Sequence, residues 1–270
     1  MIFFDGPLWE VSMMYKKTKG EIMAAPIIVK PAIAEQFENF IKNGRILFFS
    51  APCGFGKTTL TDALLKGKRG YKVRRLNAGT DDISRIFEDI GASAGDRESR
   101  KAQGKDTDWD VLVIDDLQML QEESDWQLLC ELIRARADRH FVLLSRGVPP
   151  GSLMAFRYTG LMTVLQAEDL LFDGDDIRKA LNAYNVTVTD SELHAIQKES
   201  IGYPLGVMIV AGHMSGGKPF SSAIAAQALR EVFLYFEDAV YRRFDLPVRR
   251  FLLELAPFEN FDLEMARVVT

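Results

Sequence analysis

A strand, a glycine-rich loop and a helix follow one another at residues 45–66, which read RILFFSAPCGFGKTTLTDALLK. The apolar run RILFF has the length and the aromatic and branched side chains of a buried strand. The run KTTLTDALLK is typical of a helix, and the loop before it contains Gly54 and Gly56 followed by Lys57. This order constrains the fold strongly, because such a loop needs a buried strand before it and a helix behind it.

The residue types in this loop are those that bind phosphate groups. Backbone N–H groups at a helix N-terminus attract anions, and Gly54 and Gly56 let the backbone approach a phosphate without a Cβ in the way. The usual pattern has a further glycine at the position of Ala51, where it serves the turn out of the strand, and alanine can also serve there. The lysine of such a loop reaches the β- and γ-phosphates, and the next hydroxyl binds Mg²⁺. We therefore predict a nucleotide site formed by Gly54, Phe55, Gly56, Lys57, Thr58 and Thr59.

A second motif, VLVIDD, has Asp115 and Asp116 directly after four apolar residues. An acid at the end of such a strand meets the Mg²⁺ shell, and the next acid can orient the attacking water. An apolar strand that ends in two acids is common on its own, but together with the phosphate loop it indicates the metal side of one site. We predict Thr58 and Asp115 as Mg²⁺ ligands and Asp116 as a catalytic, water-orienting acid.

Two further residues are candidates for contact with a nucleotide. Arg146 ends the apolar run HFVLLSR, and it is either a surface cation or a catalytic sensor whose guanidinium meets the γ-phosphate. Pro204, in GYPLG, is either a helix starter or a rigid apolar contact for a purine base. The carboxyl ends of parallel strands meet at one edge of a sheet, where the loop, Asp115 and Arg146 would all lie. This convergence favours the sensor role of Arg146.

Strands and helices alternate along the first part of the chain. The candidate strands beyond the loop lie at residues 71–77, 110–117, 140–146 and 162–166. Their continuous apolar runs favour a parallel sheet covered by helices on both faces. Residues 91–108 have almost no large apolar side chain, and we predict a solvated loop there.

After residue 170 the sequence predicts helices only. One covers residues 176–184, and the next begins at a capping box formed by Thr189 and Glu192. A longer amphipathic helix follows. Its apolar residues, at three- and four-residue steps, are Leu229, Phe233, Phe236, Val240 and Phe244. The chain stops inside a short final helix, which we expect to reflect a truncation.

The composition narrows the class of protein. The net charge of -5 and the pI near 5.4 leave no basic surface, so we expect no direct DNA binding by this segment. The two cysteines, Cys53 and Cys130, form no C-x-x-C pair and fit a reducing compartment. No apolar run has the length of a membrane span, and we therefore expect a cytoplasmic protein without a membrane partner.

Five segments in this order resemble one family: SAPCGFGKTTL, VLVIDDLQML, FVLLSR, LQAEDLLFDGDDIRKAL and GYPLG. They are similar to the ATP-binding portion of STAND-class signalling ATPases, in particular the MalT-like, large ATP-binding LuxR-type transcriptional regulators. The resemblance covers roughly residues 27–270 and includes a C-terminal segment that looks like the start of a winged helix.

The resemblance implies an α/β fold with a three-layer P-loop NTPase sheet, then a small all-α domain and the start of a winged helix. We expect an N-terminal extension at residues 1–26 and the P-loop NTPase core at residues 27–168. The helical domain would cover residues 169–222, and a truncated winged-helix domain would cover residues 223–270.

The resemblance also implies cofactors, partners and residue roles. ATP or ADP with Mg²⁺ would be bound, with Lys57 and Thr58 at the phosphates and Mg²⁺ and Asp115 at the metal. Arg146 would meet the γ-phosphate, and Pro204 would lie against adenine. In this family ADP holds a closed, inactive monomer. Binding of an unidentified inducer and exchange of ADP for ATP lead to self-association. Slow hydrolysis of ATP then returns the protein to the ADP-bound state.

Three functions are therefore open. The first is a slow ATP/ADP switch of a MalT-like regulator, without the sensor repeats and the DNA-binding helix-turn-helix. The second is an AAA+-like turnover ATPase that remodels a protein or nucleic acid. It would use a sensor arginine in the helical lid, where residues 176–214 offer only Arg178. The third is a scaffold that no longer binds nucleotide, which the intact Lys57, Thr58 and Asp115 disfavour. The GYPLG motif favours the switch.

Overall fold

The computed structural model describes residues 26–68, 70–83, 85–87 and 109–269, and the predicted loop at 91–108 lies outside them. Five strands form one sheet in the order β2-β3-β4-β1-β5. Every neighbouring pair of strands is parallel. The strands are β1 (Ile46–Ser50), β2 (Val73–Asn77), β3 (Val111–Asp115), β4 (His140–Ser145) and β5 (Met162–Gln166).

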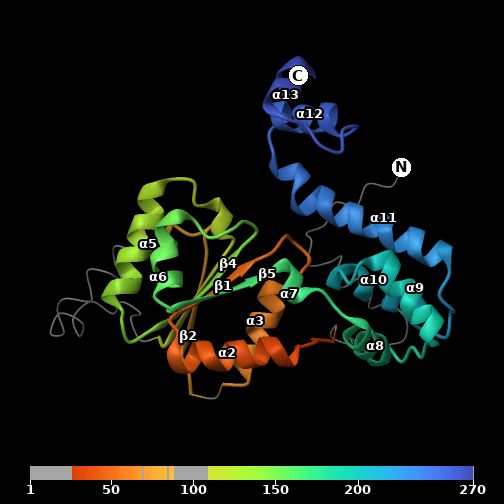
Figure 1. The fold of residues 1–270 in the computed structure, drawn as a ribbon, viewed down its shortest axis with the longest axis horizontal. Coiled ribbons are helices and arrows are strands. Elements are labelled where there is room, and N and C mark those ends of the chain that lie inside the picture. The colour runs from red at the N-terminus through yellow and green to blue at the C-terminus, as the bar shows by residue number, and fades with distance from the viewer. Residues whose placement is uncertain (1–25, 69, 84, 88–108, 270) are drawn as a thin grey trace.

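Helices cover both faces of this sheet, as Figure 1 shows. They are α2 (Pro31–Asn43) and α3 (Lys57–Lys66) on one face, and α5 (Glu123–Ala135) and α6 (Met154–Tyr158) on the other. The side chains of β1 alternate between these faces, as strand geometry requires. Ile46 and Phe48 pack against the α5 side, whereas Leu47 and Phe49 pack against the α2 side. The predicted three-layer α/β sheet is thus confirmed.

The phosphate loop leaves β1 between β4 and β5. Ala51, where the usual pattern has glycine, is buried and its N–H donates to the carbonyl of Ser145 at 3.2 Å. Gly56 is the N-cap of α3 and has a left-handed backbone, with φ of 74°. The helix then begins at Lys57, so the predicted strand, loop and helix are confirmed.

A helical unit follows β5 through the short helix α7 (Ala167–Leu170). Its helices are α8 (Gly174–Ala183), α9 (Asp190–Ser200), α10 (Pro204–Met214) and α11 (Ser222–Ala239). The predicted capping box of Thr189 and Glu192 starts α9, and Pro204 lies in the first turn of α10. Ala228 and Val232 of α11 pack into the same apolar cluster as α8 and α10, so this cluster crosses residue 222. The domain boundaries stay predictions.

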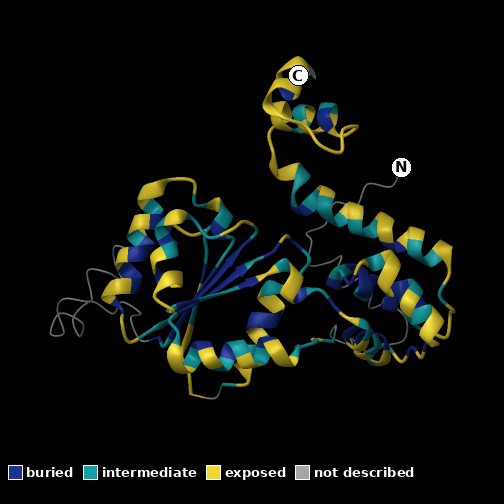
Figure 2. Ribbon diagram, viewed as in Figure 1, coloured by how far each residue is buried: buried dark blue, intermediate teal, exposed yellow. Residues whose placement is uncertain are grey.

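The helix α11 differs from the helix that we predicted. It ends at Ala239, and the backbone leaves the helical region at Val240, so neither Val240 nor Phe244 is part of it. Leu229 and Phe233 are exposed, whereas Ala228 is buried. Leu229 and Phe233 of the predicted stripe therefore lie on the exposed side of α11, along which exposed and intermediate positions alternate in Figure 2.

Two short helices, α12 (Leu246–Leu255) and α13 (Leu263–Val269), project away from the rest of the described chain (Figure 1). They lie in the segment where we predict the start of a winged helix, and that assignment stays a prediction. None of the helices in the described ranges combines the length and apolar character that crossing a membrane requires.

Candidate functional site

A cavity of about 580 Å³ lies at the carboxyl ends of the strands, between the sheet and the helical unit. Every residue that the sequence predicts for the site lines this cavity. They are Gly54, Phe55, Gly56, Lys57, Thr58, Thr59, Asp115, Asp116, Arg146 and Pro204. The structure thus brings together residues that are far apart in the sequence, while their roles stay predictions.

Lys57 folds back over the phosphate loop. Its Nζ donates to the carbonyls of Ala51 at 2.6 Å and Pro52 at 2.9 Å. Burial lowers the pKa of Lys57, Asp115 opposes this shift, and Arg146 adds to it. Beside it, Gly56 has open space where a Cβ would lie. The loop therefore presents a cationic amine and an open backbone segment to the cavity, which suits an anionic ligand.

Thr58 and Asp115 meet where the first turn of α3 faces the end of β3. The Thr58 hydroxyl donates to Oδ2 of Asp115 at 2.7 Å, and Oδ1 of Asp115 accepts from the N–H of Asp116 at 2.7 Å. A hydroxyl and a carboxylate that converge in this way are oxygen ligands of the kind that Mg²⁺ prefers. The residues present therefore fit a magnesium ion.

Asp116 is held by a network of polar side chains. Gln118 donates to its Oδ1 at 2.7 Å, and Asn77 donates to its Oδ2 at 3.2 Å. Burial raises the pKa of Asp116, but these two hydrogen bonds and the nearby Arg146 outweigh burial and hold the pKa below its usual range. Sequence reasoning missed both donors. A signal for Asn77 existed, because it is a polar residue at the end of β2, paired in register with Asp115.

Arg146 joins the sheet to α11. Its Nη2 lies 3.6 Å from Oδ1 of Asp116, and its Nη1 donates to the carbonyl of Ala239 at 3.1 Å. Its backbone N–H donates to the side chain of Gln118 at 3.1 Å. Arg146 is therefore not a free surface cation, since one guanidinium contacts both the sheet edge and the last turn of α11.

Tyr203, which sequence reasoning also missed, connects the phosphate loop to α11. Its hydroxyl donates to the carbonyl of Cys53 at 3.0 Å. Its ring lies 5.2 Å from the ring of Phe55 and 6.1 Å from that of Phe236, the latter at an interplanar angle of 16°. Gly54 has φ of 79°, and a Cβ there would overlap the Tyr203 hydroxyl. Only glycine fits this part of the loop while Tyr203 is docked.

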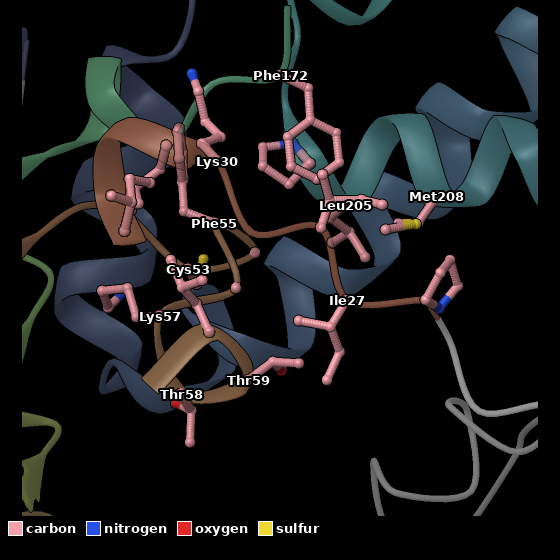
Figure 3. A pocket seen from close by; sticks show the side chains of 18 of the residues that line it. Ile27, Lys30, Cys53, Phe55, Lys57, Thr58, Thr59, Phe172, Leu205 and Met208 are labelled. Atoms are coloured by element: carbon pink, nitrogen blue, oxygen red, sulfur yellow. The ribbon is translucent and has the colours of Figure 1, made fainter. Parts of the chain in front are cut away.

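The other side of the cavity is apolar. It is formed by Pro204, Leu205 and Met208 of α10, by Phe172, and by Ile27 and Ile28. Figure 3 shows Lys57, Thr58 and Thr59 on one side of the pocket and Phe172, Leu205 and Met208 on the other.

The segment of residues 26–30, here called the leading segment, forms part of the cavity wall although it precedes the first strand. The Nζ of Lys30 donates to the carbonyl of Leu171 at 2.7 Å and lies 3.9 Å from the buried carboxylate of Asp176. These contacts tie the leading segment to the start of the helical unit. The sequence pattern predicts no site residue in this segment.

No protein-family model and no curated protein sequence matches the chain. The structure is similar to a Walker-type ATPase of Pyrococcus abyssi, with a TM-score of 0.57, 11% identity, and coverage of 90% of this chain and 88% of that one.

Two further solved structures are similar at lower TM-scores. A STAND protein of Pyrococcus horikoshii with a tetratricopeptide repeat sensor has a TM-score of 0.48 at 13% identity. The match covers 89% of this chain and 36% of that one. Domain III of the replication initiation protein DnaA of Thermotoga maritima has a TM-score of 0.47 at 16% identity, covering 76% and 94%. The sheet order and the superposition on the Pyrococcus abyssi ATPase show that this chain has the P-loop NTPase fold, followed by a helical part.

Proposed function

We propose that this chain binds ATP and ADP and acts as a nucleotide-dependent switch with slow hydrolysis. The phosphates would be held by the loop backbone and Lys57, and the base would lie against the apolar wall that includes Pro204. A cavity of about 580 Å³ has the size of a small-molecule site. Its cationic side and its apolar side suit a ligand that has phosphates at one end and an aromatic base at the other.

We propose Mg²⁺ as the companion of the nucleotide, with Thr58 and Asp115 as its protein ligands. The support is the 2.7 Å contact between their oxygens at the edge of the phosphate loop. The ion supplies positive charge that offsets the charge of phosphate oxygens. Asp116 would orient water, although both of its oxygens already accept hydrogen bonds from Asn77 and Gln118. A carboxylate held in this way favours slow hydrolysis.

The main support for the switch is that Arg146 contacts both Asp116 and the carbonyl of Ala239. A guanidinium at this position has two alternative sets of partners, namely these two oxygens or a γ-phosphate. ATP and ADP differ only in that phosphate, so binding them would favour different partners of Arg146. A ligand shifts a conformational equilibrium only through such differential contacts. The position of α11 would therefore depend on which nucleotide is bound.

The alternative of a rapid, AAA+-like ATPase is less well supported. Such an enzyme needs an arginine of the helical lid at the nucleotide. Arg178 of α8 instead donates to the exposed Asp190 at 2.7 Å, and it is not among the residues that line the cavity.

We further propose that the chain is the switch portion of a MalT-like, LuxR-type transcriptional regulator in the cytoplasm. The support is the order of its sequence motifs together with the P-loop NTPase fold. The domain division stated above, the unidentified inducer and self-association in the ATP state belong to this proposal.

The first experiment identifies the nucleotide that co-purifies with the chain. Mass spectrometry of the purified protein should detect bound ADP, and steady-state hydrolysis of ATP should be slow and proportional to protein concentration. A fast rate per molecule that rises steeply with protein concentration would contradict the switch.

The second experiment uses the Arg146→Ala variant to test whether Arg146 distinguishes ATP from ADP. ATP affinity should fall roughly tenfold more than ADP affinity, because a charge-assisted contact with one phosphate is lost. Arg157→Ala, which removes an exposed arginine of α6, is the matched control and should change neither affinity. Equal losses for ATP and ADP would show that Arg146 does not distinguish the two nucleotides.

A further inference from the structure

The face of α11 that points away from the cavity is apolar and exposed. This surface, here called the α11 outer face, consists of Ala226, Leu229, Arg230, Phe233, Leu234 and Glu237, which line one shallow groove. Leu229, Phe233 and Leu234 are 55%, 63% and 57% exposed. Figure 2 shows such exposed positions recurring along the helix. Contiguous exposed apolar side chains of this kind mark interaction sites.

The spacing of these residues is that of a helix–helix contact. Ala226, Arg230, Phe233 and Glu237 follow one another at steps of four, three and four residues. This is the repeat by which one helix lays a continuous row of side chains against another helix. Leu229 and Leu234 flank this row on its two sides. The α11 outer face is therefore suited to a helical partner.

The charges on this face indicate what the partner is. Arg230 lies on one side of the central pair Phe233 and Leu234, and Glu237 lies on the other side at an equal distance along the helix. If two copies of α11 pack antiparallel about this central pair, Arg230 of each copy lies near Glu237 of the other. A parallel pair in register would instead juxtapose like charges, which is unfavourable. The face is thus self-complementary in the antiparallel arrangement, as a two-fold interface requires.

We propose that a second copy of this chain docks antiparallel on the α11 outer face, with the two-fold axis beside Phe233 and Leu234. The charged groups are available for this contact. Among the described residues Arg230 has no ion-pair partner. Glu237 contacts Arg242 at 3.1 Å through one oxygen, Oε1, and its side chain remains 46% exposed. The interface uses the face of α11 opposite to the buried Ala228 and Ala239. It therefore needs no bound nucleotide, and it is distinct from the self-association in the ATP state named above.

Sedimentation of the whole chain without nucleotide tests whether the interface exists. The wild-type chain should form a dimer whose population rises with concentration. Phe233→Asp should weaken dimerisation at least about tenfold, because it introduces charge at the centre of the contact. Tyr158→Asp, on the exposed side of α6, is the matched control and should dimerise as the wild type does. A chain that stays monomeric, or a Phe233→Asp variant that dimerises normally, would overturn the proposal.

Charge reversal tests the pairing. Arg230→Glu and Glu237→Arg should each weaken the dimer, and the double reversal should recover much of the loss, because each copy then offers the opposite charges in the same places. These two positions are seven residues apart on one helix, so they do not contact each other within a single copy. A double variant weaker than either single variant would contradict the antiparallel pairing.

Thiol-specific cross-linking with a short linker tests the orientation. Phe233→Cys lies beside the axis and should cross-link to itself. Ala226→Cys lies about 11 Å from the axis along the helix, which separates the two copies of this residue by about 22 Å, and it should not cross-link. The native Cys53 and Cys130 are buried, so the wild-type chain gives the background. Self-cross-linking at Ala226→Cys that equals that at Phe233→Cys would show a parallel contact and overturn the proposal.

Discussion

The phosphate loop and α11 meet the same cavity through different kinds of contact. The loop uses side chains and glycines at fixed spacing, and Lys57 and Thr58 reach partners within the α/β core. The helix α11 uses the ring of Phe236 and the carbonyl of Ala239, which contact the site through Tyr203 and Arg146. Ring stacking and a backbone carbonyl leave no sequence motif. The loop residues can thus be recognised from the sequence, whereas the contacts that connect them to the helical unit depend on tertiary packing.

Among the substitutions in the phosphate loop, Lys57→Ala should have the largest effect on nucleotide affinity. We expect nucleotide affinity to fall at least about 100-fold, because the amine that would contact the phosphates is lost. Lys66→Ala, in the last turn of the same helix, is the matched control and should bind as the wild type does. Titration calorimetry measures both. Retained ATP affinity in Lys57→Ala would show that the loop is not the phosphate site.

Substitutions of two loop glycines distinguish backbone strain in the loop from steric overlap with the helical unit. Gly54 and Gly56 both have positive φ, but only a Cβ at Gly54 would overlap Tyr203. We expect Gly56→Ala to lower the free energy of unfolding by about 1 kcal/mol through backbone strain. Gly54→Ala should lower it by about 2 kcal/mol, because steric overlap is added to strain. Chemical denaturation measures both values.

A double variant checks the cause of that difference. In the Tyr203→Ala background, Gly54→Ala should cost no more than Gly56→Ala does, since the hydroxyl that it would overlap is gone. An undiminished cost in this background would show that Tyr203 does not explain the need for glycine at position 54.

A smaller change removes only one hydrogen bond between the helical unit and the phosphate loop. Tyr203→Phe keeps the ring contacts with Phe55 and Phe236 but removes the hydrogen bond to Cys53. We expect a loss of about 1 kcal/mol in the free energy of unfolding, the usual net value of one hydrogen bond. Tyr158→Phe, at an exposed position, is the control. If the two variants are equally stable, the hydroxyl does not help to hold the loop against α10.

The smallest expected effect is the pH dependence due to Asp116. Its pKa is held below the usual value of 3.8, so its carboxylate stabilises the folded chain above that pH. This stabilisation is lost as the pH falls through the lowered pKa. Asp116→Asn should therefore be less stable than the wild type at pH 7, and this difference should shrink in acid. Thermal unfolding across pH measures it, with the exposed Asp138→Asn as the control. A difference that is constant with pH would contradict the role of the carboxylate charge.

Much of the core was predictable because its signals are local. The run KTTLTDALLK predicted a helix with the bounds that the structure has, and continuous apolar runs predicted a parallel sheet covered on both faces. The residues predicted for the site lie around one cavity because parallel strands bring their carboxyl ends together.

The remaining features depend on tertiary packing, which no local sequence pattern indicates. Periodicity located α11 but not its buried side, since an apolar stripe does not show which neighbour covers it. Tyr203 stands next to the proline that we predicted, yet its importance comes from its docking on Gly54. Asn77 acts through Asp116, a residue on another strand. Such contacts become visible only once the sheet order is known.

The position of the leading segment has a practical consequence for shortening the chain. A version trimmed to begin at α2 would keep every recognisable motif and the whole sheet. It would lose Ile27, Ile28 and Lys30, and with them one wall of the cavity and the tie to Leu171. We expect such a version to fold with an intact phosphate loop but to bind a ligand in this cavity more weakly. Expression boundaries for this chain should therefore be drawn before residue 26.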